Sequence, residues 1–298
     1  MRVLLTGKSG FLGSIIFEKL RFSNDIVTLG RGIENAIRIA DFKQLSNLKN
    51  VFQPVGRVIH VAGLAHKEGK SIDALFDEVN HLGTISLCNW VDSFKQKPKQ
   101  FIFISSVSVY GKEFGVGISE LDSLEGKSPY ALSKIHAEEY LRSWGEKNGI
   151  AVLILRLPLI VGSNPPGNLG KMINGIKSGK YFSIGTGGAR KSMVLADDVA
   201  ELLLNVPFIG GTFNLTDGYH PSFFEMESLI SNQLSTKLPI NLPLFLAKMI
   251  AKIGDMLPGF PLTTGVVKKI TSDLIFSDNL AKEKLNWNPN KVIEKFKL

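Results

Sequence analysis

The feature that most constrains the fold is a glycine-rich turn near the N-terminus. Residues Arg2–Thr6 form a short apolar segment that favours a β-strand, and apolar residues at helical spacing begin at position 15. Between them Gly7, Gly10 and Gly13 recur at every third position. A strand, a glycine turn and a helix in this order let the backbone approach a pyrophosphate, whose charge the helix N-terminus favours. The spacing differs from the commoner G-x-G-x-x-G, and a tight turn without a ligand would use the same glycines.

Strand-like and helix-like segments alternate through the first half of the chain. Further strands are predicted over residues 26–29, 36–39, 57–61, 100–104 and 151–157. This alternation predicts an α/β fold with a Rossmann-type doubly wound parallel sheet. Later loops are rich in glycine, proline and asparagine and predict a smaller C-terminal lobe that shares the cleft. We therefore predict a dinucleotide-binding domain over 1–162, with segments returning from the C-terminal half, and a second lobe over 163–298.

The composition excludes several classes of protein. Hydrophobic residues make up 44% and charged residues 21% of the chain, which is typical of a globular protein. The single cysteine, Cys88, permits neither an internal disulfide nor a cysteine-based metal site, which favours a cytoplasmic location. No basic and apolar leader precedes the first strand, in keeping with that location. We predict no metal site, because no pair at metal-ligand spacing occurs among His60, His66, His81, His136 and His220.

The formal charge of +8 has several physical explanations, of which phosphate-bearing small ligands are one. The basic residues are spread along the chain rather than clustered, which argues against a nucleic-acid partner. The uncharged run 238–247 is too short to span a bilayer. Because Lys248, Lys252 and Asp255 follow it, we predict an amphipathic helix of the smaller lobe there.

Residues after the second, third and fourth strands favour a dinucleotide cofactor. The second strand ends beside Arg31, where an NAD-specific fold usually places an acid and where an arginine accepts the 2′-phosphate of NADP. Arg31 therefore favours NADP over NAD, and its stacking on an adenine is the alternative. Asp41 and Phe42 follow the third strand, where they could bracket an adenine ring. Ala62 and Gly63 end the fourth strand and let the backbone pass close under a ligand.

Asn80 lies near the middle of a long helical pattern that covers residues 72–91. Its amide either bonds a neighbouring backbone across the core or lies on the surface, and the spacing supports both equally.

Serines end the fifth strand, and a tyrosine and a lysine open the next helix. Ser105, Ser106 and Ser108 follow the strand at the carboxyl edge of the sheet, where open parallel sheets bind ligands. Tyr130 and Lys134 are four residues apart, so a helix places both side chains on one face. A lysine beside a tyrosine favours the phenolate and lowers the phenol's pKa from about 10. The pair therefore predicts a general base.

Ser128 and Pro129 precede this pair and predict the start of the helix, as N-cap and first helical residue. Tyr130 would then lie in the first turn, at the mouth of the site.

Five segments in this order resemble the extended short-chain dehydrogenase/reductase family. They are TGKSGFLG at 6–13, SSVSVYG at 105–111, YALSK at 130–134, GARKSMVLADDVA at 188–200 and FNLTDG at 213–218. Within the family the chain is most similar to NAD-dependent epimerases and dehydratases related to UDP-glucose 4-epimerase, and to nucleotide-sugar 4-keto reductases. The resemblance covers nearly the whole chain.

The resemblance implies a role for each matching residue. Tyr130 would be the acid/base at the sugar oxygen, Lys134 would bond the nicotinamide ribose, and Ser106 would bond the sugar oxygen. The cofactor would be held by Gly7, Gly10, Phe11, Leu12, Gly13, Asp41, Phe42, Ala62, Gly63, Asn80, Tyr130 and Lys134. The substrate would contact Ser106, Ser108, Tyr130, Asn168, Leu169 and Arg190.

The resemblance also implies an activity, namely NAD(P)-dependent redox chemistry at C4 of a nucleotide-activated hexose, with a UDP-hexose as substrate. The reaction would be 4-epimerisation or 4-keto reduction in surface-polysaccharide precursor synthesis, by a possible homodimer. A dinucleotide-sensing regulator without catalysis is the alternative.

Two departures from the family pattern concern the substrate. Leu157-Pro158-Leu159 replaces a frequent substrate-binding asparagine after Arg156, and a C-terminal arginine has no clear match near Lys268 and Lys269.

Overall fold

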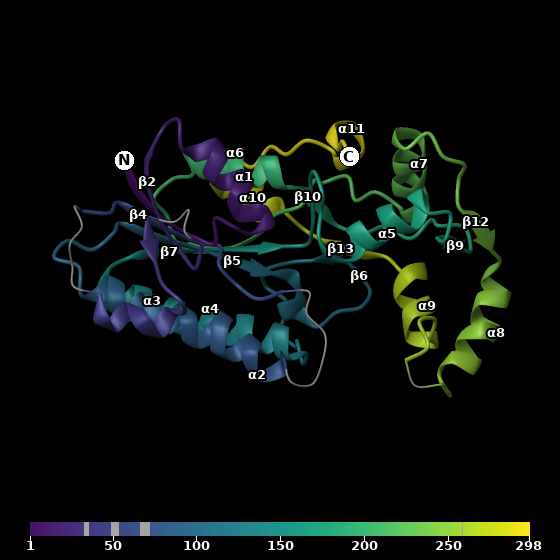
Figure 1. Ribbon diagram of the computed structural model, residues 1–298, viewed down its shortest axis with the longest axis horizontal. Helices are drawn as coiled ribbons and strands as arrows, with labels where there is room; N and C mark the ends of the chain where they lie inside the picture. Colours follow the sequence, from purple (N-terminus) through teal and green to yellow (C-terminus); the bar gives the residue numbers. More distant parts are fainter. Residues whose placement is uncertain (33–35, 49–53, 66–71, 258) are drawn as a thin grey trace.

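A parallel seven-stranded sheet forms the centre of the protein, in the order β11-β7-β5-β4-β1-β2-β3 (Figure 1). Its strands are β1 Arg2–Thr6, β2 Asp25–Gly30, β3 Ile37–Arg38, β4 Arg57–His60, β5 Gln100–Ser106, β7 Ala151–Leu157 and β11 Gly211–Asn214. The computed structural model describes residues 1–32, 36–48, 54–65, 72–257 and 259–298. The predicted α/β class with a Rossmann-type parallel sheet is confirmed, and β11 is an edge strand that the sequence did not predict.

Helices cover both faces of the sheet (Figure 1). One face carries α1 Phe11–Leu20, α6 Ala196–Asn205 and α10 Asn279–Leu285, and the other carries α3 Gly83–Asp92 and α4 Pro129–Asn148. Alternate strand residues enter the two cores: Leu5 packs with Ile16 on the first side, and Leu4 packs with Leu87 and Leu141 on the second. The sheet is therefore buried on both faces, as a parallel sheet requires.

The strands end together at one edge of the sheet. Thr6 of β1 pairs with His60 of β4, and His60 pairs with Phe103 of β5. Two residues later in β5, Ser105 pairs with Arg156 of β7. The loops that leave these strands therefore start side by side, which brings the predicted site residues to one edge.

The helical pattern over residues 72–91 forms three consecutive segments: α2 Asp73–Phe76, the π-helical η3 Asp77–Leu82, and α3. The π-helical turn places extra chain at Asn80, where the sequence pattern is interrupted. Such turns are rare and frequently lie at functional sites.

A smaller lobe is built on three short strand pairs beyond the carboxyl edge. These are β8 Leu159–Val161 with β10 Met193–Leu195, β9 Phe182–Ile184 with β12 Ile240–Leu242, and β6 Gly115–Ile118 with β13 Leu274–Phe276. Its helices are α5 Gly167–Lys177, α7 Phe223–Gln233, α8 Leu244–Gly254, α9 Thr264–Thr271 and α11 Val292–Lys295. The helix predicted over 238–247 is wrong in its bounds, because β12 occupies 240–242 and Pro243 is the N-cap of α8.

None of the helices in the described ranges combines the length and the apolar character needed to cross a bilayer.

Candidate active site

The glycine turn joins β1 to α1 and depends on the absence of side chains. Gly7 has a φ of +80°, and a Cβ there would lie 2.5 Å from the Ala62 nitrogen. A Cβ on Gly13 would lie 1.9 Å from the Gly7 carbonyl oxygen. Both glycines are therefore required by backbone packing alone. Gly10 differs, because a Cβ there meets nothing closer than the same oxygen at 3.3 Å.

This turn fits the pyrophosphate of a dinucleotide. Gly10 is the N-cap of α1 and offers no side-chain cap to the first helical turn. The backbone N–H groups of Phe11, Leu12 and Gly13 therefore remain able to bind an anion, which the helix dipole also favours. Because Gly10 has no side chain, it leaves the space in front of these N–H groups open. The Phe11 ring packs against Gly162, where an added Cβ would lie 3.1 Å from the ring.

Asn80 fastens the loop after β4 to the first turn of α4. Its Oδ1 accepts a hydrogen bond from the Leu64 N–H at 2.6 Å, and its Nδ2 donates to the Leu64 carbonyl at 3.1 Å and to Ser133 Oγ at 3.0 Å. Ser133 Oγ in turn donates to the Tyr130 carbonyl. Of the two predicted roles for Asn80, the bond to a neighbouring backbone is confirmed. The side chain supports the loop that contains Gly63, where a Cβ would lie 3.1 Å from Asn80 Oδ1.

A buried relay centred on His60 supports the same loop, and sequence reasoning missed it. Thr84 Oγ1 donates to the Asn80 carbonyl at 2.6 Å, so it accepts a hydrogen bond from His60 Nε2 at 3.0 Å. His60 Nδ1 then accepts from Thr6 Oγ1 at 2.6 Å, and Thr6 Oγ1 accepts from the Ala62 N–H. Burial lowers the pKa of His60 to about 3, so the ring is neutral. The signal in the sequence was a polar residue at the end of each of two adjacent buried strands.

Tyr130 lies in the first turn of α4, as predicted. Ser128 caps this helix by accepting a hydrogen bond from the Ala131 N–H at 3.2 Å, and Pro129 is the first helical residue. The half-buried Tyr130 ring packs edge-on against Phe76 of α2, with 5.8 Å between ring centroids. The phenol is thus held in one orientation at the carboxyl edge of the sheet.

Lys134 is 5% exposed and directs its ammonium group at β5. Its Nζ donates to the Ile104 carbonyl at 2.9 Å and lies 4.5 Å from the centroid of the Phe103 ring. Burial raises the pKa of the Tyr130 phenol, and a hydrogen bond with Ser106 acts in the opposite direction. The prediction that Lys134 lowers the phenol's pKa is therefore wrong, because desolvation outweighs the polar contacts. Burial also lowers the pKa of Lys134 to about 8.

The three serines after β5 have different surroundings. Ser105 Oγ donates to Glu138 at 2.6 Å and is buried in the core. Ser106 Oγ accepts a hydrogen bond from the Ser108 N–H at 3.2 Å. Ser108 Oγ is buried and has no hydrogen-bond partner among the described residues. An unpaired buried hydroxyl costs about 1–3 kcal/mol, which a ligand oxygen would offset.

A buried ionic network lies behind these serines. Glu138 of α4 accepts hydrogen bonds from Arg156 Nη2 at 2.6 Å, Arg156 Nε at 3.1 Å and Arg142 Nη2 at 2.7 Å. Arg156 Nη1 also donates to the Tyr110 hydroxyl at 2.9 Å. The network joins α4, β5 and β7 directly behind the predicted catalytic residues.

The predicted adenine-side residues lie at the end of the sheet that holds β2 and β3. Arg31 is exposed where β2 ends. Asp41 Oδ1 accepts a hydrogen bond from the Lys43 N–H at 2.7 Å, so this carboxylate caps a short 3₁₀ turn. The Phe42 ring packs edge-on against His60, with 5.6 Å between centroids. Their roles toward an adenine remain predictions.

The predicted substrate residues of the smaller lobe differ in their availability. Asn168 is exposed in the first turn of α5, whereas the Leu169 side chain is 2% exposed in the core of the lobe. Arg190 Nη1 donates to the carbonyls of Tyr219 and His220, at 3.3 and 3.0 Å. Leu169 therefore offers only its backbone to a ligand. One nitrogen of the Arg190 guanidinium already donates to carbonyls of the loop after β11.

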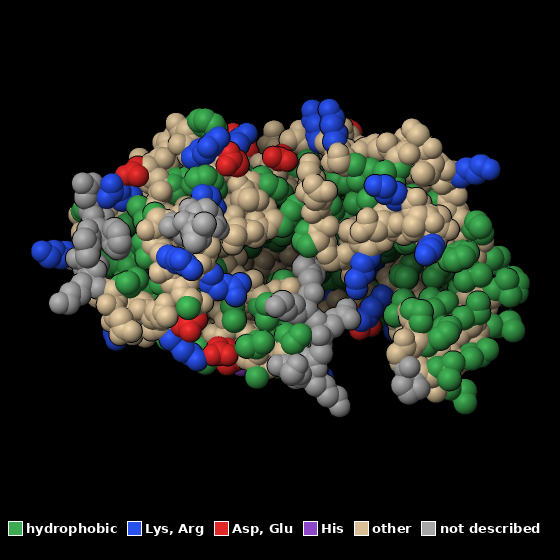
Figure 2. Space-filling view, viewed as in Figure 1, with side chains coloured by type: hydrophobic (Ala, Val, Ile, Leu, Met, Phe, Trp, Pro, Cys, Tyr) green, Lys and Arg blue, Asp and Glu red, His purple; other side chains and the backbone are tan. Residues whose placement is uncertain are grey.

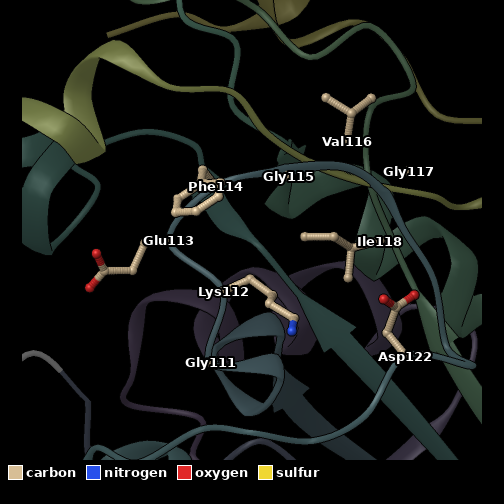
Figure 3. A pocket seen from close by; sticks show the side chains of 9 residues that line it. All are labelled: Gly111, Lys112, Glu113, Phe114, Gly115, Val116, Gly117, Ile118 and Asp122. Atoms are coloured by element: carbon tan, nitrogen blue, oxygen red, sulfur yellow. The ribbon is translucent and has the colours of Figure 1, made fainter.

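A pocket of about 560 Å³ is lined by Gly111–Ile118 and Asp122 (Figure 3). Its loop directly follows Tyr110, which is fully buried. Two lysines of α9 reach this loop: Lys269 pairs with Glu113 at 2.8 Å, and Lys268 lies 4.4 Å from the centroid of the Phe114 ring. These lysines, considered as replacements for a C-terminal arginine, therefore join α9 to the pocket loop.

Two histidines that are distant in sequence lie together beside Asp77 of η3. Nδ1 of His81 lies 3.0 Å and Nδ1 of His136 lies 3.5 Å from Asp77 Oδ1, and the rings are 5.2 Å apart. They meet because α4 packs against η3, which spacing along the sequence does not show, and the prediction of no metal site stays a prediction. The three ligand atoms lie within 4.8 Å of one another. His66 lies outside the described residues.

Comparison with known proteins identifies the family. Residues 3–206 match the model of the NAD dependent epimerase/dehydratase family. The chain belongs to this family. As a family member it is an NAD(P)-dependent enzyme of the nucleotide-sugar epimerase and reductase type, with a nicotinamide dinucleotide as its cofactor. The resemblance recognised in the sequence is confirmed.

Similar proteins include epimerases with different sugar carriers in their names. The chain is 24% identical to UDP-glucose 4-epimerase of Vibrio cholerae, over 98% of this chain and 92% of that protein. It is 27% identical to N-acetyl-alpha-D-glucosaminyl-diphospho-ditrans,octacis-undecaprenol 4-epimerase of Escherichia coli O157:H7, over 80% and 73%. The fold matches a solved structure of UDP-glucose 4-epimerase with UDP-glucose from Thermotoga maritima, with a TM-score of 0.74, 21% identity, and coverage of 99% and 96%.

Proposed function

We propose that this family member carries out redox chemistry at C4 of a UDP-hexose, as a 4-epimerase that serves surface-polysaccharide precursor synthesis. The observation that carries the proposal is the arrangement of Ser106, Tyr130 and Lys134 at the carboxyl edge of the sheet, beside the glycine turn. Relatives named as UDP-glucose 4-epimerases support the choice of reaction and nucleotide. We also propose that 1–162 is mainly the dinucleotide-binding domain and 163–298 the substrate lobe.

The proposed chemistry assigns a role to each side chain. A bound nicotinamide ring supplies or accepts the hydride. Tyr130 moves a proton at the sugar O4: it takes the proton from a hydroxyl and returns it to a ketone. Ser106 donates a hydrogen bond to the same oxygen, and the unpaired Ser108 hydroxyl is available to a neighbouring sugar oxygen. Lys134 keeps a positive charge near the ribose below its pKa of about 8.

A 4-keto-sugar reductase that uses NADPH is the second candidate. The exposed Arg31 at the end of β2 favours it, since an arginine there suits a 2′-phosphate. The raised pKa of Tyr130 also favours it, because a protonated phenol is the state that gives a proton to a ketone. Asn168 and Arg190 are proposed to contact the diphosphate of the substrate in either reaction.

Mass spectrometry of the dinucleotide released on denaturation separates the two reactions. Near-stoichiometric NAD with interconversion of UDP-glucose and UDP-galactose supports the epimerase. A protein that binds NADPH far better than NADH and reduces a UDP-4-keto sugar supports the reductase. Absence of any dinucleotide binding contradicts both.

Tyr130→Phe tests the catalytic assignment, with Tyr140→Phe on the same helix as its control. We expect Tyr130→Phe to lower turnover by about 10²–10⁴-fold, because the proton has no carrier, and to leave dinucleotide binding unchanged. Tyr140, whose hydroxyl is directed at Asn89 of α3, should retain full activity as phenylalanine. Near-normal turnover in Tyr130→Phe would refute the assignment.

A further inference from the structure

Helix α8 turns its largest apolar side chains toward solvent. Phe245, Met249 and Ile253 are exposed by 63, 60 and 60%, and Met256 directly after the helix by 81%. These residues recur at spacings of three and four and therefore form one continuous face. Leu246, Ile250 and Leu257 extend this face, with exposures of 36 to 50%. We call the seven residues the α8 face; Figure 2 shows the apolar surface over α8 at one end of the molecule.

The small residues of α8 face the protein instead. Ala247, Ala251 and Gly254 are buried against α9 and β9. A Cβ on Gly254 would lie 2.2 Å from the Leu262 carbonyl oxygen, so the helix cannot rotate to bury its large side chains. A helix of a soluble globular protein normally has the reverse pattern, with its apolar stripe toward the core. Contiguous exposed apolar patches of this kind mark an interaction site.

The charges around the α8 face are basic. Lys248 and Lys252 follow Phe245 by three residues and by seven, which places them along one border of the face. Across residues 237–262 the sequence contains one acidic residue, Asp255. Both carboxylate oxygens of Asp255 accept hydrogen bonds from Thr264 at the start of α9, so this charge is directed away from the face.

We propose that the α8 face docks on the surface of an anionic phospholipid bilayer, with Phe245, Met249 and Ile253 inserted among the headgroups and Lys248 and Lys252 on the phosphates. A large apolar face beside lysines is the pattern of helices that lie in a membrane interface. Anionic lipid also supplies the negative charge that the border lacks. A twofold contact between two copies would instead bring four lysines to one interface without opposing acids. Docking requires no particular reaction, so it stands apart from the proposed function.

The docked helix would lie on the carboxyl side of the central sheet. Figure 1 shows α8 and α9 at the end of the molecule toward which the strands run. Lys268 and Lys269 of α9 connect this end to the pocket loop after Tyr110. A membrane at the α8 face would therefore contact the smaller lobe itself, on the carboxyl side of the sheet.

Vesicle flotation with the full-length protein tests the proposal, because aggregated protein does not float. We expect the protein to float with vesicles of phosphatidylcholine and phosphatidylglycerol, and to do so less at high salt. The triple variant Phe245→Ser, Met249→Ser, Ile253→Ser should bind at least ~100-fold more weakly. The double variant Lys248→Ser, Lys252→Ser should bind anionic vesicles about 25-fold more weakly, at about fivefold per lysine.

Phe22→Ser is the matched apolar control, since Phe22 is 81% exposed and lies outside the α8 face. It should float as the unchanged protein does. Failure of the unchanged protein to float, or equal flotation of the triple variant, overturns the proposal. Sedimentation velocity tests whether the α8 face binds a second copy of the chain instead. A stable dimer that becomes a monomer in the triple variant would assign the face to that contact and would also overturn the proposal.

Discussion

Replacing Glu138 with Gln should destabilise the protein strongly while changing few atoms. Glu138 is fully buried, and its Oε2 accepts hydrogen bonds from both Arg156 and Arg142, at 2.6 and 2.7 Å. An amide nitrogen at the Oε2 position would direct N–H groups at those donors, and an amide nitrogen at the Oε1 position would direct them at Arg156 Nε, which cannot accept a hydrogen bond. Neither rotamer satisfies the site. The Arg156 side chain, 3% exposed, would keep its charge without a counterion.

The expected cost follows from burial. Removing one partner of a buried ion pair costs about 3–5 kcal/mol, and the hydrogen bonds that glutamine retains place this variant near about 3 kcal/mol. At about 2–4 °C per kcal/mol, the melting temperature should fall by about 6–12 °C. Arg142→Ala breaks a contact whose arginine is 39% exposed, and should cost only about 0.5 kcal/mol after screening by solvent.

Differential scanning fluorimetry and urea unfolding measure both variants. The double variant Glu138→Leu, Arg156→Met removes both charges and should recover most of the stability, since apolar replacements of buried pairs are often neutral. The reasoning is refuted if Glu138→Gln unfolds within 0.5 kcal/mol of the unchanged protein, or if the double variant is less stable than the single one.

Three further outcomes test other parts of the site. Gly13→Ala should abolish dinucleotide binding, because its Cβ would lie 1.9 Å from the Gly7 carbonyl oxygen. Gly10→Ala should weaken binding without lowering the melting temperature, because its Cβ would lie 3.3 Å from the same oxygen. Calorimetric titration with NAD and NADPH measures both affinities. Asn80→Leu should lower dinucleotide affinity and cost about 1–3 kcal/mol, because the Leu64 N–H and carbonyl lose their partner; unchanged unfolding would contradict the role given to this amide. His60 binds a proton near pH 6.5 in the unfolded chain but only near pH 3 in the folded protein. The free energy of unfolding should therefore fall as the pH drops through that window, by up to about 1.4 kcal/mol per pH unit. Urea unfolding of His60→Gln should show a shallower fall.

Local patterns predicted the first half of the chain well. The strand from Arg2 to Thr6 and the helix start at Ser128 and Pro129 agree with the structure, because strand alternation and N-cap chemistry act over a few residues. The interactions that hold the site together were not predictable in this way. The Thr6, His60 and Thr84 relay joins three elements, and its members read as ordinary strand or helix residues until the sheet register is known.

The features that the sequence did not predict depend on burial and on packing between distant segments. The pKa of Tyr130 depends on desolvation and on where the Lys134 ammonium points, and neither follows from i and i+4 spacing. His81 and His136 meet because α4 packs against η3. For α8, the apolar run predicted a helix, but which face the smaller lobe covers depends on the close contact at Gly254.

The packing of Gly7 and Gly13 means that the cofactor loop is assembled when the protein folds, before any ligand arrives. Gly7 packs against the Ala62 backbone, and Gly13 packs against the Gly7 carbonyl. A ligand therefore loses little binding energy to ordering this segment, and the affinity reports mainly direct contacts. We predict that selection between NAD and NADP acts at the far end of the cofactor, around Arg31, which lies outside the turn.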